Sequence, residues 1–230
     1  MDIVYILKNG PLSEELRYSL RSLKNFPHGK VWFFGGAPEG IKPDRAVEFQ
    51  QEGRTKWEKV RNSLYKVCRT EEITPDFWLF NDDFFCMKPC IGIPTYYNGD
   101  LYSRISEITD RHHGTSPYSE ELRRTAQALE AEGCGVLNYA VHLPMLINRH
   151  DAIEVLDTFS DVPMFRSLYG NYMSVGGVDR RDVKIYGPIE EPDPDTDWLS
   201  TTDISFRYGK VGEYIRSVFK EPSEYEQAET

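Results

Sequence analysis

The sequence predicts an α/β fold with a mostly parallel central sheet and helices on both faces. Two observations carry this prediction. Short apolar runs rich in aromatic and β-branched residues alternate with longer segments of helical periodicity through the first half of the chain. Their order is strand, helix, strand, strand, helix, strand, and such alternation is typical of parallel strands joined by crossover helices.

The first half contains the clearest elements. Strands are expected at 2–7, 31–34, 46–49 and 77–80, and helices at 13–23 and 56–68. Ser13 is placed to cap the first helix, whose first turn carries Glu14 and Glu15. Ligands of parallel sheets collect at the carboxyl ends of strands. Three polar or glycine segments follow predicted strand ends and are expected to share one crevice: Asn9, Gly35–Gly36 and Asp82–Asp83.

The second half is less regular. Helices are expected at 119–132, 149–159 and 206–219, and an extended segment at 135–142. Residues 188–198 are acidic and proline-rich and are expected to form a loop, either solvated or acting as a lid. Ser200–Asp203 is expected to cap the last helix or to close over a ligand. His112–His113 is expected to lie in a loop.

Composition bounds the class of protein. The net charge is −10, with 40% hydrophobic and 13% aromatic residues, so a packed core is expected and a broad nucleic-acid surface is disfavoured. No apolar run is long enough to span a membrane, and strand-like residues begin at Ile3, so no signal peptide is expected. The four cysteines, Cys68, Cys86, Cys90 and Cys134, are expected to be reduced structural thiols in a cytoplasmic protein.

A basic segment contrasts with the acidic total charge. Six cations lie within residues 54–69, with only Glu58 opposing them: Arg54, Lys56, Lys59, Arg61, Lys66 and Arg69. The segment is either a solvated helix face or an edge that faces the phosphates of a nucleotide or a polyanionic acceptor.

Asp82 and Asp83 are the most informative pair in the chain. They follow the buried aromatic run Phe77–Phe80, where that strand leaves the sheet. Adjacent carboxylates repel each other, and Mg²⁺ or Mn²⁺ relieves the repulsion while bridging to a phosphate. A turn in which Asn81 and Asp82 cap backbone groups is the alternative.

Several stretches together resemble the Stealth family of sugar-phosphate transferases, which act on bacterial capsules and include a lysosomal-enzyme phosphotransferase. The matching stretches are 2–5, 15–22, 61–63, 80–85, 142–144 and 165–167. The strings Glu15–Ser22 and Asn81–Phe85 are specific in combination. The chain departs from the family at Ile6–Asn9, where the family has an acidic strand end.

The resemblance implies a nucleotide-sugar-binding fold related to the GT-A glycosyltransferases. It implies a UDP-sugar as the donor, Mn²⁺ or Mg²⁺ as the cofactor, and transfer of either a sugar or a sugar phosphate to an acceptor hydroxyl. A single catalytic domain is expected over 1–220, with a donor half at 1–100, an acceptor half at 101–220 and a polar tail at 221–230. A bacterial or phage-infected cytosol is expected as the setting.

Site residues follow from the same resemblance. Asp83, with Asp82, is expected to hold the metal, His142 to act as general base, and Arg166 to clamp a phosphate. The residues expected to bind the donor are Asn9, Arg17, Arg21, Asn62 and Asn81. For His142 the alternative is a core histidine, and for Arg21 an ion pair with Glu14 or Glu15.

Two other functions stay open from the sequence. The first keeps the chemistry but uses a hydroxymethylated DNA base as acceptor, as in phage DNA-modification systems, with the basic segment 54–69 along the strand. The second is a non-catalytic module that binds a nucleotide or glycan. The sequence leaves the sugar, the acceptor and the oligomeric state open.

Overall fold

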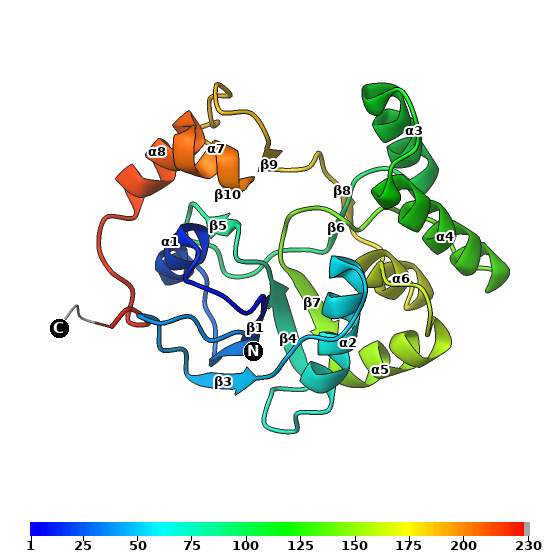
Figure 1. The fold of residues 1–230 in the computed structure, drawn as a ribbon, viewed down its shortest axis with the longest axis horizontal. Coiled ribbons are helices and arrows are strands. Elements are labelled where there is room, and N and C mark those ends of the chain that lie inside the picture. Colours follow the sequence, from blue (N-terminus) through cyan, green and yellow to red (C-terminus); the bar gives the residue numbers. More distant parts are fainter. Residues whose placement is uncertain (228–230) are drawn as a thin grey trace.

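A computed structural model describes residues 1–227, and its centre is a five-stranded sheet in the order β3-β2-β1-β4-β7 (Figure 1). Its strands are β1 (Asp2–Leu7), β2 (Val31–Gly35), β3 (Arg45–Glu48), β4 (Asp76–Phe80) and β7 (Met145–Asn148). The first four are parallel, and β7 runs antiparallel at the edge. The predicted α/β fold with a mostly parallel sheet is therefore confirmed.

The order of the strands places a switch point at the middle of the sheet. The chain moves outward from β1 to β2 and β3, and then returns to β4 on the other side of β1. Helix α1 (Glu14–Ser22) makes the crossover from β1 to β2, and α2 (Lys56–Cys68) makes the crossover from β3 to β4. In α/β sheets the ends of strands that diverge in this way leave an opening for a ligand.

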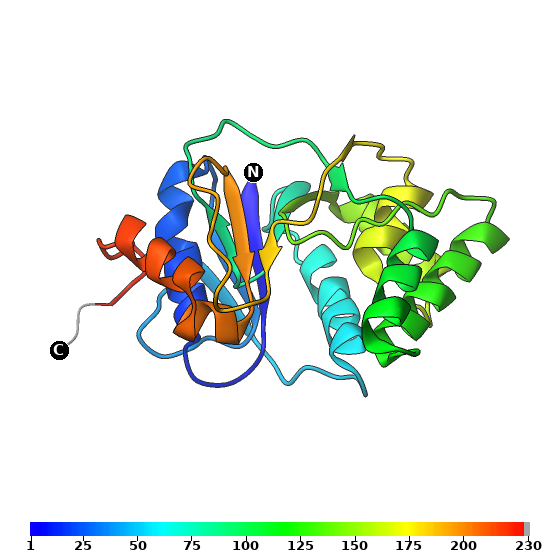
Figure 2. The ribbon, with the colours of Figure 1, turned by 90° about the horizontal axis from the view of Figure 1, so that it is seen from above.

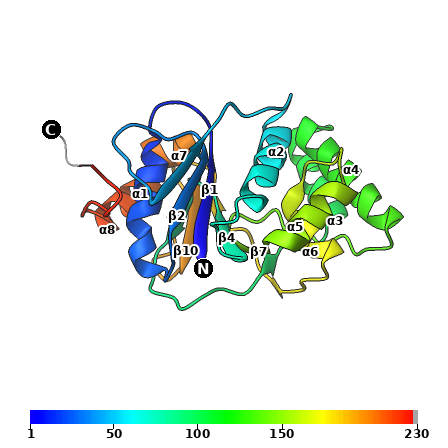
Figure 3. The same cartoon turned by 90° about the horizontal axis from the view of Figure 1, so that it is seen from below.

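The two helices cover opposite faces of the sheet, as Figure 3 shows from below. On one face Leu16 and Leu20 of α1 pack against Tyr5, and the short 3₁₀ helix η1 (Leu23–Asn25) continues this layer. The side chain of Ser13 accepts a hydrogen bond from the Leu16 amide, so the predicted cap is confirmed. Phe26 is 1% exposed and lies edge-on to Trp78, Phe80 and Trp198, which fixes this layer to the sheet.

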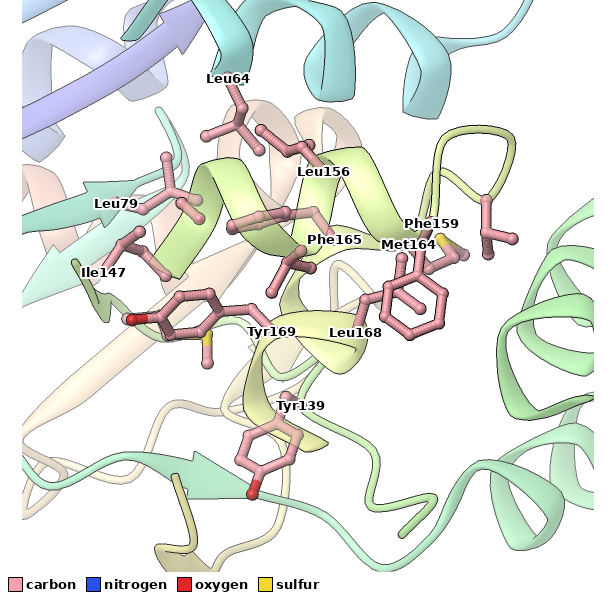
Figure 4. Packing of buried hydrophobic residues seen from close by; sticks show 14 of the residues in the cluster. Leu64, Leu79, Tyr139, Ile147, Leu156, Phe159, Met164, Phe165, Leu168 and Tyr169 are labelled. Carbon is pink, nitrogen blue, oxygen red and sulfur yellow. The ribbon is translucent and has the colours of Figure 1, made fainter. Parts of the chain in front are cut away.

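The other face carries the larger helical layer. It contains α2, the pair α3 (Leu101–His112) and α4 (Pro117–Ala131), and the pair α5 (Arg149–Thr158) and α6 (Phe165–Tyr172). Leu64 of α2, Leu79 of the sheet and Phe165 of α6 share one buried cluster (Figure 4). This layer forms one wall of the cavity described below.

A second, smaller sheet lies on the α1 side. Its strands are β5 (Phe84–Cys86), β10 (Trp198–Thr201) and β9 (Lys184–Ile185), in that order. Phe84 and Trp198 face the core beside α1, whereas Phe85 and Leu199 face the helices α7 (Asp203–Tyr208) and α8 (Lys210–Val218). Figure 2 shows this sheet between the central strands and the two C-terminal helices. A two-stranded ribbon of β6 (Tyr96–Tyr97) and β8 (Val178–Asp179) completes the fold.

The second half differs from the sequence expectations at several places. Helices α3 and α6 and strand β7 were not predicted, and residues 135–142 form no regular strand. The expected helix at 206–219 is two helices, because Gly209 is extended and α8 turns back on α7. Gly212 permits that turn, since a Cβ there would lie 1.7 Å from the carbonyl oxygen of Phe206. His112 ends α3 rather than lying in a loop.

The predicted polar tail is packed as far as residue 227. Tyr225 is 6% exposed, and its hydroxyl contacts His28 Nε2 at 3.0 Å. Glu226 accepts two hydrogen bonds of 2.7 Å from Arg21. Residues 228–230 lie outside the described part of the chain.

All four cysteines are free thiols, in agreement with the sequence. Within residues 1–227 no helix has the length and apolarity that a membrane span requires.

Candidate active site

A cavity of about 570 Å³ opens at the switch point between β1 and β4. Ile6 of β1 and Leu79 and Phe80 of β4 form its base at the carboxyl ends of these strands. Leu64 of α2 and Phe165 of α6 line the wall on the side of the helical layer. The cavity therefore lies where the topology alone predicts a ligand site.

The polar lining of this cavity is cationic. Its charged residues are Lys56, Arg104, Arg166 and Lys184, and among the described lining residues none is acidic. Arg104 is paired at 2.9 Å with Glu107, which is half-exposed outside the cavity. In a protein of net charge −10, a cavity whose described charged lining residues are all cations indicates an anionic ligand.

Aromatic rings form one end of the cavity. Trp57 at the start of α2 stacks on Tyr118 of α4, with ring centroids 6.0 Å apart and planes at 21°. Tyr186 lines the same end. Burial raises the pKa of Tyr118 to about 12, so its hydroxyl stays protonated as a hydrogen-bond donor. Such a platform accepts the flat face of a nucleobase or of a sugar ring.

His142 lies in the cavity lining and is held by Asp182. Its Nδ1 is 2.8 Å from Oδ2 of Asp182, and its backbone amide donates to Oδ1 of the same carboxylate. The amide of Lys184 also donates to Oδ1. The imidazole and the hydrogen bond that it gives hold the pKa of Asp182 below its ordinary value, although burial opposes this.

This arrangement assigns the tautomer of His142. An ionised Asp182 can only accept hydrogen bonds, so Nδ1 must carry the proton. In the neutral ring Nε2 is then the basic nitrogen, and it makes no hydrogen bond to residues 1–227. A histidine oriented by a carboxylate in this way is suited to take a proton from a bound hydroxyl.

Arg166 braces the cavity wall from α6. Its guanidinium donates to the carbonyl oxygens of Leu143 and Leu79, and at 3.3 Å to the side chain of Asn81. Burial lowers its pKa to about 10, partly offset by Asp83, so it stays charged at neutral pH. Asn81 and Arg166 line the cavity together, but three of the guanidinium hydrogen bonds go to the protein itself.

The small sheet joins Asp83 to Lys184. Ser200 of β10 pairs with Lys184 of β9 on one side and on the other with Phe84 of β5, the residue that follows Asp83. Oδ2 of Asp83 lies 2.7 Å from Nζ of Lys184 and accepts a 3.0 Å hydrogen bond from the Ser200 hydroxyl. Asp83 is only 8% exposed and lies behind Lys184, which itself lines the cavity.

Asp82 and Glu15 interact electrostatically with this pair, and both have raised pKa values. Burial and the neighbouring charge of Asp83 raise the pKa of Asp82 to about 6. Burial, opposed by a hydrogen bond from Thr201, raises the pKa of Glu15 to about 7. The charge of Lys184 acts on Asp82 and Glu15 as well as on Asp83, with which it is paired, and near neutral pH the two outer acids are partly protonated.

The predicted Mg²⁺ or Mn²⁺ site does not fit the side chains as they lie. Oδ2 of Asp83 is already occupied by Lys184 and Ser200, and Asp82 does not line the cavity. In the part of the chain that the structure describes, no three His, Cys, Asp or Glu side chains form a possible metal site. A divalent cation at Asp83 would also be repelled by the ammonium of Lys184.

The other predicted donor-binding residues lie away from this cavity. Asn9 lines a separate depression together with Gly35 and Gly36. The side chain of Asn9 donates a hydrogen bond to the Phe49 carbonyl oxygen, and Phe49 lines the same depression. The single crevice expected for the strand ends is therefore divided. Arg17 and Arg21 face Glu226 rather than Glu14 or Glu15.

The basic segment is mostly occupied by contacts within the protein. Arg61 is 8% exposed and donates to the Leu156 carbonyl, while Asn62 donates to the Glu52 carbonyl. Lys66 lies over the ring of Phe49. Lys56 alone among the six cations lines the cavity. The segment is therefore not a continuous phosphate-binding edge.

Asp182 and Lys184 are the functional candidates that sequence reasoning missed. Asp182 lies in the short irregular segment before β9, and Lys184 is the first residue of that two-residue strand, so no periodic pattern marks either residue. A charged cluster next to the two-residue strand β9 was the available signal. Their importance depends on contacts with His142 and Asp83, which are 40 and 101 positions away in the chain.

No protein-family model matches the chain, and no curated protein sequence matches it. Among solved structures, it is similar to the galactosyltransferase LgtC in complex with donor and acceptor sugar analogs. That match has 12% identity and a TM-score of 0.40, over 74% of this chain and 68% of that chain. An active-site mutant of LgtC matches at 11% identity and a TM-score of 0.36, over the same shares. At such values neither a family nor an activity follows for this chain.

Proposed function

We propose that the protein is a transferase that moves a sugar, or a sugar phosphate, from a nucleotide-sugar donor to an acceptor hydroxyl. One observation carries the proposal. His142, which is held by Asp182, lies in the lining of a cavity whose described charged lining residues are all cations, at the switch point of a parallel sheet. A base beside an anion-binding cavity suits a phosphate-bearing substrate that is attacked by a hydroxyl.

The donor diphosphate would lie along the cationic residues. Lys184 and Arg166 are on the side of β4 and the small sheet, and Lys56 and Arg104 are on the side of α2 and α3. The stacked rings of Trp57 and Tyr118 would receive a flat ring of the donor or the acceptor. The Stealth resemblance and the Asn81–Phe85 string support a nucleotide-activated sugar, with a UDP-sugar as the first donor to test.

His142 would act on the acceptor. Nε2 takes the proton of the acceptor hydroxyl while Asp182 stabilises the imidazolium that forms. In glycosyl transfer the acceptor oxygen bonds to the anomeric carbon, and the bond from that carbon to the diphosphate breaks. In sugar-phosphate transfer the acceptor oxygen bonds to phosphorus, and a nucleoside monophosphate leaves.

A metal-dependent form of this reaction, with Mg²⁺ or Mn²⁺ on Asp82 and Asp83, would require Lys184 to leave Asp83. When bound, such an ion would neutralise charge on the leaving phosphate. We assign no step to it, because the carboxylate that it needs is already paired with an ammonium group.

The test is incubation with a panel of nucleotide sugars and chromatography of the released nucleotide, with water as the default acceptor. A nucleoside diphosphate indicates glycosyl transfer, and a nucleoside monophosphate indicates sugar-phosphate transfer in the manner of the Stealth family. His142→Gln should abolish release, whereas His150→Gln, a change at the exposed start of α5, should not. Binding of donors without any turnover would favour the non-catalytic binding module instead.

A DNA base is the less supported of the possible acceptors. It requires a basic edge along a strand, and in the structure Arg61 and Lys66 are used in internal contacts. Salt-sensitive binding of DNA in a gel-shift experiment would restore this alternative.

A further inference from the structure

We propose that Lys184 is a built-in cation for the donor phosphate and replaces a divalent metal ion in this protein. The inference rests on the proposed function for the identity of the donor, but its first test needs only an anion. It explains why the Asp82–Asp83 pair, which predicts a metal from sequence, lies outside the lining of the cavity.

The side chain of Lys184 is held in place by the buried carboxylate of Asp83. Its Nζ lies 2.7 Å from Asp83, and the side chains of Lys184 and Asp83 are 15% and 12% exposed. Asp83 is in turn held by the Ser200 hydroxyl from the neighbouring strand. The ammonium group is thus attached to a buried carboxylate on one side while it lines the cavity on the other.

The ammonium group also has free hydrogen-bonding capacity. It carries three N–H donors, and within residues 1–227 it donates only to Asp83. Two donors remain for oxygens of a phosphate. Charge-assisted hydrogen bonds of this kind are short and strong, and lysine binds phosphate as a point charge.

The surrounding charges favour the ammonium group of Lys184 over a bound divalent metal ion as the partner of the donor phosphate. Asp83 neutralises part of the ammonium charge, and Arg166 lines the same cavity as Lys184. A donor phosphate would therefore meet Lys184 and Arg166 together. In glycosyl transfer the electron pair of the breaking bond goes to a diphosphate oxygen, and these two groups stabilise the charge that forms there.

The experiment measures binding by calorimetry, without turnover. The intact protein in EDTA is titrated with inorganic pyrophosphate and with UDP, and the titrations are repeated with excess Mn²⁺. The expected result is binding in EDTA with an affinity within about twofold of that with Mn²⁺. Lys184→Met should weaken binding in EDTA by about tenfold or more, the loss of one charge-assisted contact. Lys88→Met, which removes an exposed ammonium paired with Asp195, should change nothing.

A second result distinguishes two roles of Lys184, namely replacement of a metal ion at Asp83 and a general attraction between an ammonium group and a phosphate. Without Lys184 the carboxylate of Asp83 has no cationic partner and keeps only the hydrogen bond from Ser200, so Mn²⁺ should now restore binding to Lys184→Met although it does nothing for the original protein. Since an unpaired Asp83 can destabilise the fold, Lys184→Arg and the double variant Lys184→Met, Asp83→Asn are measured as well. The arginine variant should keep metal-free binding, and the double variant should lose it and resist restoration by Mn²⁺.

Each outcome has a separate meaning. Binding that requires Mn²⁺ in the original protein overturns the inference and leaves the proposed transferase standing. Binding in EDTA that Lys184→Met does not weaken, or no pyrophosphate binding at all, also overturns it. Lysine-dependent, metal-free binding without turnover of any nucleotide sugar supports the inference and counts against the proposed function.

Discussion

Replacing Asp182 with asparagine should remove most of the activity while leaving the cavity intact. The carboxylate accepts three hydrogen bonds, from Nδ1 of His142 at 2.8 Å and from the amides of His142 and Lys184 at 3.2 Å each. In the asparagine variant Oδ1 can still accept from both amides. The new amide group, however, donates to Nδ1, so the proton of the neutral ring moves to Nε2, the nitrogen that must act as base.

The expected loss follows from the role of a general base. Such a group contributes about 10²–10⁴ in rate, so kcat should fall by this range, or about 3–5 kcal/mol in activation free energy. KM for the donor should change little, since Asp182 does not line the cavity. The assay is nucleotide release at saturating donor, with Asp161→Asn at an exposed surface carboxylate as the control. A kcat within about threefold of the original would refute the assignment of His142 as base.

Three further predictions concern stability and binding. Burial raises the pKa of Glu15 to about 7 from its ordinary value of 4.5. The folded protein therefore binds the proton of Glu15 more tightly than the unfolded chain does. The resulting contribution to the free energy of unfolding is fully present below pH 4.5 and is lost as the pH rises through 7. Glu15→Gln should therefore stabilise the protein at pH 8 by about 1–3 kcal/mol and leave its stability unchanged at pH 4. Glu14→Gln, the control, should change the stability at neither pH. Equal denaturation midpoints of the original protein and Glu15→Gln at pH 8 would contradict this prediction. Trp57→Ala should weaken donor binding by about tenfold in calorimetry, and Trp57→Phe should retain most of it, because stacking needs a ring; an unchanged Kd in the alanine variant would remove the aromatic platform. Phe26→Ala should cost about 3–5 kcal/mol in urea unfolding, because the ring is fully enclosed by three aromatic neighbours; a loss below about 1 kcal/mol would mean that the α1 layer repacks.

The first half of the fold was predictable because its signals are local. Strands β1, β2 and β4 are apolar runs, and Ser13 marks the start of α1 through its own hydrogen bond to the chain. The second half contains strands of two to four residues, such as β9 and β7, which are too short for a period to be recognised. The partners that make them strands lie far away in sequence.

The candidate site was predicted in part for the same reason. His142 and Arg166 were singled out through the resemblance, and the structure brings both to one cavity. The metal expectation at Asp82 and Asp83 came from two adjacent carboxylates. It failed to anticipate Lys184, because nothing near Asp83 in the sequence indicates an ammonium group 101 positions away.

The sequence by itself determined the parallel sheet, the two crossover helices and the edge at which a ligand site lies, since these depend on hydrophobic period and strand order. Only the tertiary structure decided which charges meet there. The small sheet brings Lys184 to Asp83 and the segment before it brings Asp182 to His142. Electrostatic pairing depends on distance in space, and the chain brings these groups within hydrogen-bonding distance only when the sheets and helices have packed.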